Sequence, residues 1–252
     1  MINIKSPREV AIIKEASRLV AKVFEEVGPL VKPGVSTQYL ADMAEKVIQS
    51  GGGIAACKGY GGFPGAICVS VNEVIVHGIP SAKKILRDGD IVSLDVVAKY
   101  KGYHGDACRT YPVGIVGEEK LRLIKVTEEC FWEGVKLVKA GVRLGDVEEA
   151  IQKHAEGNGY SVVREFTGHG IGREMHEDPY IPNYGKAGTG PTLREGMVLC
   201  IEPMIMSGKP DVRTLGDGWT TLSKDGLPNA HYENTIVVTK DGYEVLTLEE
   251  KL

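Results

Sequence analysis

The chain has 252 residues, of which 42% are hydrophobic and 25% charged, and its net charge is −4. This length suits one large domain or two small ones. The slightly acidic balance, without a basic run, argues against nucleic acid as the principal ligand. Apolar runs stay below the roughly 20 residues that span a bilayer. The first residues, MINIKSPREV, lack a signal-peptide core, so we expect a cytoplasmic protein.

The chain is predicted to begin with two helices. Ser6 and Pro7 form a typical helix start, and apolar residues keep a helical period as far as Val27. Ser36 or Thr37 caps a second helix, which ends in a run of three glycines. These helices should cover one face of a sheet.

Extended segments and a second helical pair follow. We expect strands at Ala66–Val71, Val74–Val76 and within Ile91–Thr110. Helices are predicted over Glu118–Val138 and Leu144–Glu156, and the chain is strand-rich from residue 161 onward.

A short internal repeat links the two parts of the chain. Leu30–Val35 (LVKPGV) is echoed 107 residues later by Leu137–Val142 (LVKAGV). A match this short can arise by chance, but the shared order of long helix, echo, shorter helix, glycine break and strands favours duplication. We therefore expect an α+β protein, a single catalytic domain over residues 1–252, with halves of about 1–116 and 117–252 around one sheet.

Acidic residues interrupt three apolar strands. Asp95 lies in IVSLDVV, Glu202 in MVLCIEPMI and Glu233 in HYENTIVVT, while Asp106 follows in the next extended segment. A buried, unpaired carboxylate costs several kcal/mol, so each acid needs a cation or a full set of hydrogen bonds. A single such acid is often a salt-bridged strand residue. The whole set, with His169 between two glycines, predicts a bound metal.

The predicted ligands are dominated by oxygen. Such a site suits manganese, iron(II), cobalt or zinc. Four carboxylates carry more charge than one divalent ion neutralises well, so we expect two ions, bridged by a carboxylate and a water or hydroxide.

The remaining polar candidates are histidines and cysteines. His176 follows His169 by seven residues, and His77 ends an apolar strand, where it could equally satisfy a turn. His104, predicted in a loop, and His154, in a polar helix, carry no predicted role. The five cysteines form no CxxC pair and are odd in number, so we expect small buried apolar side chains at Cys57, Cys68, Cys108, Cys130 and Cys200.

Five segments resemble the type I methionine aminopeptidases, in order and in spacing. They are Asn72–Pro80, Ser93–Tyr111, Phe166–Tyr184, Ile201–Ile205 and His231–Thr239. The resemblance covers essentially the whole chain, and the third segment, with its two histidines, is especially specific. It implies the pita-bread (creatinase/aminopeptidase) fold: two pseudo-symmetric halves around a curved, mainly antiparallel sheet, with helices outside.

The resemblance also implies a role for each matched residue. The ligands of a dinuclear metal centre would be Asp95, Asp106, His169, Glu202 and Glu233. Asp106 and Glu233 would bridge the ions, and Glu202 would also shuttle a proton. His77 would lie near the scissile amide nitrogen, and His176 would hydrogen-bond the peptide carbonyl.

The implied methionine pocket departs from the family pattern at two positions. Its residues would be Cys57, Tyr60, Phe63, Cys68, Met175 and Trp219. The family often has Tyr at position 63 and Phe at 175. Both replacements here are apolar, so we expect methionine preference to survive, while affinity for inhibitors could differ. A monovalent cation is expected near Asn72, Val74 and Asn229.

The implied activity is removal of the initiator methionine from nascent polypeptides whose second residue is small. Hydroxide activated by two divalent ions (Co, Mn, Fe(II), Zn or Ni) would attack the scissile carbonyl. We expect a monomer that meets its substrates at the ribosome, with no membrane partner.

Rival functions fit less well. Aminopeptidase P and prolidase share the ligands but usually carry an additional N-terminal domain, whereas here the first half begins within about six residues of Met1. A non-catalytic binding protein would not need every ligand, and a metal-storage protein would not need the histidines or the pocket. Type II enzymes carry a long helical insertion, whereas only 30 residues separate Glu202 from Glu233, so we expect the short bacterial form.

Overall fold

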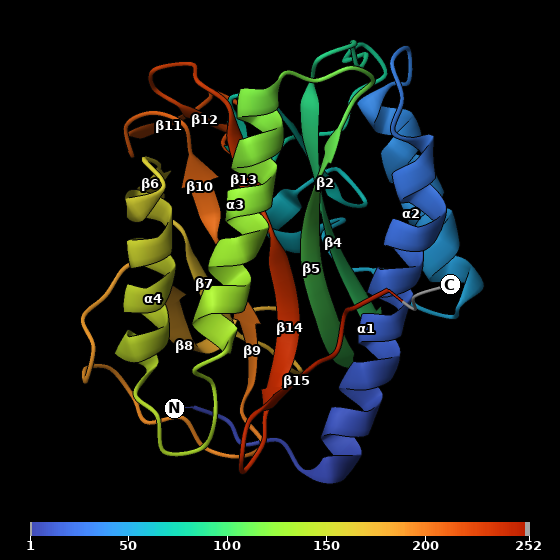
Figure 1. Cartoon of the computed structure of the whole chain (residues 1–252). Helices are drawn as coiled ribbons and strands as arrows, with labels where there is room; N and C mark the ends of the chain where they lie inside the picture. The colour runs from blue at the N-terminus through green and yellow to red at the C-terminus, as the bar shows by residue number, and fades with distance from the viewer. Residues whose placement is uncertain (1, 250–252) are drawn as a thin grey trace.

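The computed structural model describes residues 2–249, which form an α+β fold with helices outside a central sheet (Figure 1). The helices are α1 (Pro7–Val27), α2 (Thr37–Ser50), α3 (Glu118–Val135) and α4 (Leu144–Gly157), with short 3-10 helices η1 (Gly28–Leu30) and η2 (Tyr60–Gly62). The strands are β1 (Ile54–Ala55), β2 (Cys68–Val71), β3 (Val74–Val76), β4 (Ile91–Tyr100), β5 (Tyr103–Pro112), β6 (Ser161–Val162), β7 (Thr167–Gly170), β8 (Glu177–Pro182), β9 (Val198–Ile201), β10 (Met204–Met206), β11 (Val212–Thr214), β12 (Thr221–Ser223), β13 (Asn229–His231), β14 (Glu233–Val238) and β15 (Tyr243–Val245).

The main sheet has nine strands. Its order is β1-β4-β5-β14-β9-β7-β8, with β15 paired to β14 and β2 paired to β4. Two three-stranded sheets, β13-β10-β6 and β11-β12-β3, complete the strand layer. Every strand pairing among residues 2–249 is antiparallel. The predicted α+β architecture is confirmed.

Local sequence signals fix the helix boundaries. The Ser6 side chain accepts a hydrogen bond from the Glu9 backbone N–H, and the Glu9 carboxylate accepts one from the Ser6 backbone, which is a capping box. Ser36 caps α2 by accepting a hydrogen bond from the Tyr39 N–H. Helix α3 ends three residues before its predicted end, because the N–H groups of Leu137 and Val138 bond carbonyls three residues back.

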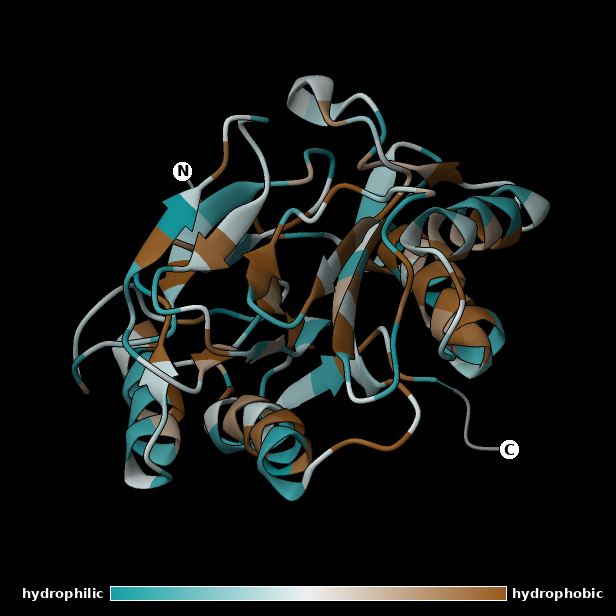
Figure 2. Ribbon diagram, turned by 90° about the horizontal axis from the view of Figure 1, so that it is seen from above, coloured by the Kyte–Doolittle hydropathy of each residue, from teal (hydrophilic) through white to brown (hydrophobic). Residues whose placement is uncertain are grey.

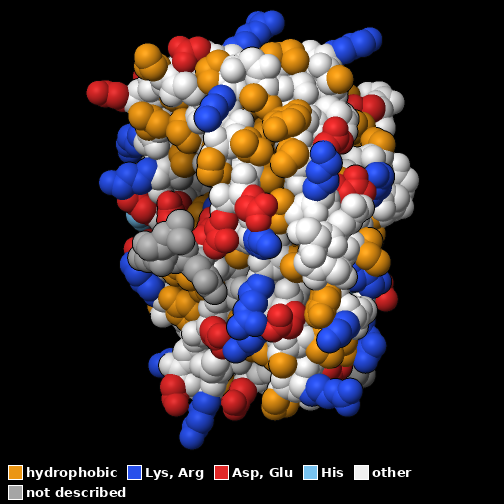
Figure 3. Space-filling model, turned by 90° about the vertical axis from the view of Figure 1, so that its right-hand side faces the viewer, with side chains coloured by type: hydrophobic (Ala, Val, Ile, Leu, Met, Phe, Trp, Pro, Cys, Tyr) orange, Lys and Arg blue, Asp and Glu red, His pale blue; other side chains and the backbone are white. Residues whose placement is uncertain are grey.

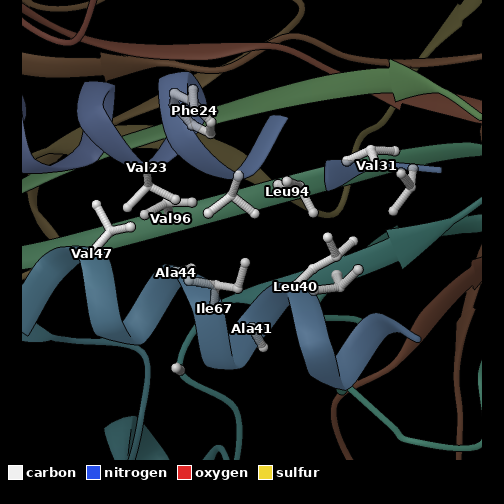
Figure 4. Packing of buried hydrophobic residues seen from close by; sticks show 14 of the residues in the cluster. Val23, Phe24, Val31, Leu40, Ala41, Ala44, Val47, Ile67, Leu94 and Val96 are labelled. Carbon is white, nitrogen blue, oxygen red and sulfur yellow. The ribbon is translucent and has the colours of Figure 1, made fainter. Parts of the chain in front are cut away.

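The helices turn their apolar faces toward the sheet and their polar faces outward (Figure 2). In the first half of the chain, Val23 and Phe24 of α1, Leu40 of α2 and Leu94 of β4 belong to one buried apolar cluster (Figure 4). Each such side chain contributes about 1.5–3 kcal/mol when it leaves water. A second core lies under α3 and α4. These two cores hold the strands of the site from opposite halves of the chain.

The surface shows mixed charge. On the face in Figure 3, Lys and Arg side chains are interspersed with Asp and Glu, without a large region of one sign. None of the helices in residues 2–249 has the length and apolar character needed to cross a membrane.

Two predictions about individual residues can be compared directly with the fold. The five cysteines are buried and unpaired, as predicted. The placement of His104 in a loop was wrong, because it lies in β5 with its side chain 5% exposed. Its Nδ1 lies 3.1 Å from the carbonyl oxygen of Gly172, a long-range contact that the local sequence does not reveal.

Candidate metal centre and substrate pocket

Neighbouring strands of the main sheet bring the predicted ligands together. Asp95 and Asp106 lie on the two strands of the β4–β5 hairpin, whose ten residue pairs run from Ile91–Pro112 to Tyr100–Tyr103. Glu233 begins β14 and pairs with Cys108 of β5. Glu202 directly follows β9, and His169 lies in β7 opposite Cys200 of β9. Four of the candidates therefore lie on β4, β5, β7 and β14, and Glu202 lies just past the end of β9 instead of inside a strand as predicted.

The side chains converge at distances that suit a shared cation. His169 Nε2 lies 3.8 Å from Asp106 Oδ2 and 3.5 Å from Glu202 Oε1. Asp106 Oδ1 and Glu233 Oε1 are buried without a hydrogen-bond partner. Buried polar atoms are normally satisfied, so two unpartnered carboxylate oxygens facing one space indicate a ligand there. The Nδ1 atom of His169 lies 2.9 Å from the Gly170 carbonyl oxygen, which fixes the ring.

The pKa values of these side chains are shifted in the directions that favour a bound cation. Burial raises the pKa of Asp106, Glu202 and Glu233, and repulsion between the neighbouring acids raises it further. Burial likewise raises the pKa of Asp95 to about 7. Burial lowers the pKa of His169 to about 3, so its imidazole is neutral and can act as a ligand. A divalent cation would stabilise the ionised forms of the four acids and leave the His169 imidazole neutral.

Cys200 lies close to the same ligands. Its sulfur belongs to a group of donor atoms within 4.8 Å of one another, with Asp106, His169 and Glu233. Burial raises its pKa well above the usual value, and its Sγ lies 3.6 Å from the Thr235 hydroxyl. Cys200 is therefore a buried thiol beside the proposed ligands, packed against Thr235.

Two histidines stand beside the acids. His176 lies with its ring centroid 4.4 Å from that of His169, and its Nδ1 lies 2.7 Å from the Tyr60 hydroxyl. His77 has a φ of 57°, uncommon for a non-glycine residue. Its ring packs edge-on against Phe166 and Trp219. The aromatic contacts hold His77 facing the cavity.

An apolar cluster adjoins the acids. Cys57, Phe63, Cys68 and Met175 are buried together, and Trp219 packs against them. Phe63 and Trp219 meet edge-on with centroids 5.3 Å apart. The cluster forms a wall for an unbranched apolar side chain.

One cavity of about 290 Å³ joins the acids to this wall. All thirteen residues predicted for the metal, catalytic and methionine sites line it. They are Cys57, Tyr60, Phe63, Cys68, His77, Asp95, Asp106, His169, Met175, His176, Glu202, Trp219 and Glu233. The chain thus brings together residues that are up to 176 positions apart.

His231 was missed by the sequence analysis. It lines the same cavity, and its buried Nε2 has no hydrogen-bond partner. This atom lies 3.8 Å from Glu202 Oε2 and 3.9 Å from Glu233 Oε2. The available signal was its spacing of two from Glu233, which in an extended chain places both side chains on one face. Val76, Val97, Glu165, Phe166 and Thr167 also line the cavity.

The predicted monovalent-cation residues lie next to one another. The Asn229 N–H donates to the Asn72 carbonyl oxygen at 3.1 Å, and Val74 begins β3 two residues later. Asn72 has a φ of 53°, and the Asn229 side-chain amide is buried without a partner.

Comparison with known proteins agrees with this geometry. A family model described as metallopeptidase family M24 matches residues 11–240. Methionine aminopeptidase 1 of Bacillus subtilis is 49% identical over 247 residues, which cover 98% of this chain and 99% of that protein. The crystal structure of methionine aminopeptidase from Thermotoga maritima superposes with a TM-score of 0.97 at 46% identity, over 99% of this chain and 100% of that one.

The fold alone is shared more widely. The prolidase of Pyrococcus furiosus matches with a TM-score of 0.80 at 24% identity, and this chain covers 66% of its length. The enzymes of both kinds share the pita-bread fold, which is therefore the fold of this chain. The family match and the almost complete alignment with bacterial enzymes place this chain in the methionine aminopeptidases of metallopeptidase family M24.

Proposed function

We propose that this chain removes N-terminal methionine from polypeptides whose second residue is small. One observation carries the proposal: a single cavity is lined both by acids with unpartnered oxygens and by an apolar cluster. That arrangement suits an apolar first residue beside a hydrolytic centre.

The donor set fits two divalent ions. Asp95, Asp106, His169, Glu202 and Glu233 would hold them, with Asp106 and Glu233 as the bridging carboxylates. Support comes from the unpartnered oxygens of Asp106 and Glu233 and from the raised pKa values of the acids. The ions would supply Lewis acidity, which polarises the scissile carbonyl and acidifies water. Oxygen-rich ligands suit Co, Mn, Fe(II), Zn or Ni.

Protein side chains would handle the proton and the peptide. The Glu202 carboxylate, itself one of the proposed ligands and 9% exposed, would accept the proton from the attacking water and pass it to the leaving amine. The Tyr60 hydroxyl would donate to His176 Nδ1, which leaves the ring proton on Nε2. That proton would hydrogen-bond the carbonyl oxygen as negative charge develops. His77 would orient the scissile amide.

The proposed pocket would suit a methionine side chain. A flexible thioether packs well against aromatic rings and sulfur atoms, as Phe63, Trp219, Cys57, Cys68 and Met175 provide. Tyr60 would close the pocket at its exposed edge. The two departures from the family pattern, Phe63 and Met175, keep this wall apolar.

A monovalent cation would support the site from outside. We place it near the Asn72 and Val74 carbonyls and the Asn229 amide oxygen. The buried amide of Asn229 lacks a partner, which is the observation that supports this placement.

The cellular setting follows from the substrate. The chain would act in the cytoplasm, as a monomer, on nascent N-termini emerging from the ribosome. Its partners would then be unfolded peptide ends, which enter the cavity directly.

Peptide assays test the function. Met-Ala-Ser should be cleaved to methionine and Ala-Ser, and Gly-Pro or other X-Pro peptides should not. Chelation should abolish cleavage, and added Mn, Co or Fe(II) should restore it. Activity that persists in chelator would contradict the metal assignment, and X-Pro cleavage would favour a prolidase.

A further inference from the structure

A buried ion pair lies behind the turn that carries Met175 and His176. Lys5 Nζ lies 2.5 Å from Glu177 Oε2, and the two side chains are 5% and 8% exposed. Asn3 also donates to Glu177 Oε2, at 3.1 Å. The other oxygen, Oε1, accepts from the Glu174 N–H at 3.3 Å. One carboxylate thus joins the N-terminal segment to Glu174 within the turn 172–177, which Glu177 itself ends.

The fold makes close contact around this pair. A side-chain Cβ at Gly172 would lie 2.4 Å from Lys5 Cε and 2.6 Å from Glu177 Oε1. At Gly196, whose φ is 84°, a Cβ would lie 2.8 Å from the Lys5 carbonyl oxygen. The Lys5 backbone N–H also donates to the Gly196 carbonyl. Lys5 is therefore enclosed by two backbone segments of the second half, and only glycine leaves room for it.

The hydrogen bonds to Glu177 keep its carboxylate ionised although it is buried. Burial raises the pKa of Glu177, but the hydrogen bonds from Lys5 and Asn3 outweigh burial, so its pKa lies below the usual value. Breaking one partner of a buried pair leaves an uncompensated charge, which is costly. Figure 1 shows the N-terminal segment crossing below the sheet to reach α1, which itself packs on β4 and β5. Lys5 thus links the turn to the first half.

We propose that the Lys5–Glu177 pair is a positioning clamp, which holds the turn 172–177 so that His176 and Met175 face the substrate. The clamp acts through these two residues and does not touch the substrate. This proposal rests on the role assigned to His176 above. It adds residues 3–5, remote from the cavity, to the parts of the chain on which the reaction depends.

Kinetics of paired variants test the clamp. Lys5→Met and Glu177→Gln should each lower kcat/KM for Met-Ala-Ser by about 10- to 100-fold, since a displacement of 1 Å costs about that much. Lys5→Arg, which keeps the charge, should recover most of the rate. Lys14→Met is the matched control, because Lys14 forms an exposed ion pair with Glu244 at 2.8 Å, and its rate should be unchanged.

A background lacking His176 separates positioning from folding. If the clamp acts through His176, Lys5→Met should cost little further rate in a His176→Ala protein. A purely structural role would lower the rate by the same factor in both backgrounds. Equal losses would overturn the proposal.

Hydrogen exchange gives a readout that needs no activity. In the metal-free protein, Lys5→Met should speed exchange of the amides in 172–177, while amides of α3 keep their wild-type rates. Unchanged exchange in the turn would overturn the clamp, even in an active enzyme. A wild-type protein that cleaves no Met-Ala-Ser would instead contradict the proposed function and leave the exchange result interpretable.

Discussion

At the residue scale, the site is built from groups whose burial is costly in isolation. Asp106 and Glu233 each leave an oxygen without a partner, and His231 adds an unpartnered nitrogen 3.9 Å from Glu233. A folded protein keeps such atoms unsatisfied where a ligand completes them. Substitution of individual side chains at the site should therefore change the rate or the metal content in specific ways.

His176→Ala should reduce kcat by about 100-fold, the usual loss for one oxyanion donor. Metal content should stay at the wild-type level, because His176 is not among the ligands proposed here. Steady-state kinetics with Met-Ala-Ser and metal analysis of the same preparation provide both measurements. An unchanged kcat would remove His176 from the reaction.

Asp106→Asn and Glu233→Gln should each lower the number of bound ions per chain. Each amide removes a negative ligand and its bridging ability, while keeping the shape of the side chain. Metal analysis after dialysis against a defined concentration of Mn²⁺ gives the stoichiometry. Two tightly bound ions in either variant would contradict the bridging assignment.

At the element scale, α4 carries a buried acid that is separate from the metal centre. Glu148 is 8% exposed, and burial raises its pKa to about 7. A Cβ at Gly185 would lie 2.5 Å from Glu148 Oε2, so the loop after β8 covers the carboxyl. Helix α4 is therefore expected to respond to pH.

Because the pKa of Glu148 is higher in the folded state, the folded protein binds a proton at this carboxyl more tightly than the unfolded chain does. The free energy of unfolding should fall as pH rises from about 4.5 to about 7, by at most about 3 kcal/mol. Glu148→Gln should flatten this dependence and raise stability at pH 8. Urea denaturation of both proteins at several pH values measures how the free energy of unfolding depends on pH.

The adjacent residue provides the control for that experiment. Glu149 carries an exposed ion pair with Lys153, and exposed pairs contribute little. Glu149→Gln should keep the wild-type pH profile. Identical profiles for wild type and Glu148→Gln would contradict the interpretation of Glu148.

At the scale of the whole molecule, we propose a single domain of two duplicated halves, about 1–116 and 117–252. Isolated bridges join Ser36 to Ile85 and Arg143 to Thr192, each member displaced by the same 107 positions as the sequence echo. Strands β4 and β9 begin at the same displacement. Asp95 and Glu202 are also 107 positions apart, so the duplication supplies one acid from each half.

Metal should stabilise the whole molecule, because ligands from both halves surround it. An ion that binds only the folded state at 100 times its dissociation constant adds about 2.7 kcal/mol. Thermal unfolding with and without Mn²⁺ should show a higher Tm in metal. The shift should shrink in Asp106→Asn, and an equal shift there would point to binding elsewhere.

Sequence reasoning predicted the helices, the fold and thirteen of the nineteen residues that line the cavity. Acids such as Asp95 and Glu202 were visible because they break an apolar pattern, and helix starts such as Ser6 were visible because capping is local. His231 and the contact of His104 with Gly172 were not predicted. The role of Lys5 was also missed, since its partner is 172 positions away and a lysine near a helix start is usually solvated.

Residues near each end of the described chain bond to residues of the opposite half. Lys5 reaches Glu177, while Arg109 of β5 bonds the Thr247 carbonyl, the Glu249 carboxylate and the Glu233 carbonyl, all in the last strands or beyond. During synthesis, Lys5 can form its ion pair only after residue 177 has been made. Arg109 can form all of its bonds only after residue 249 has been made. Such contacts between distant positions form slowly. The cavity is therefore complete only once Glu233 has joined the sheet, and the bonds of Arg109 that hold this region form only once residues 247–249 are in place.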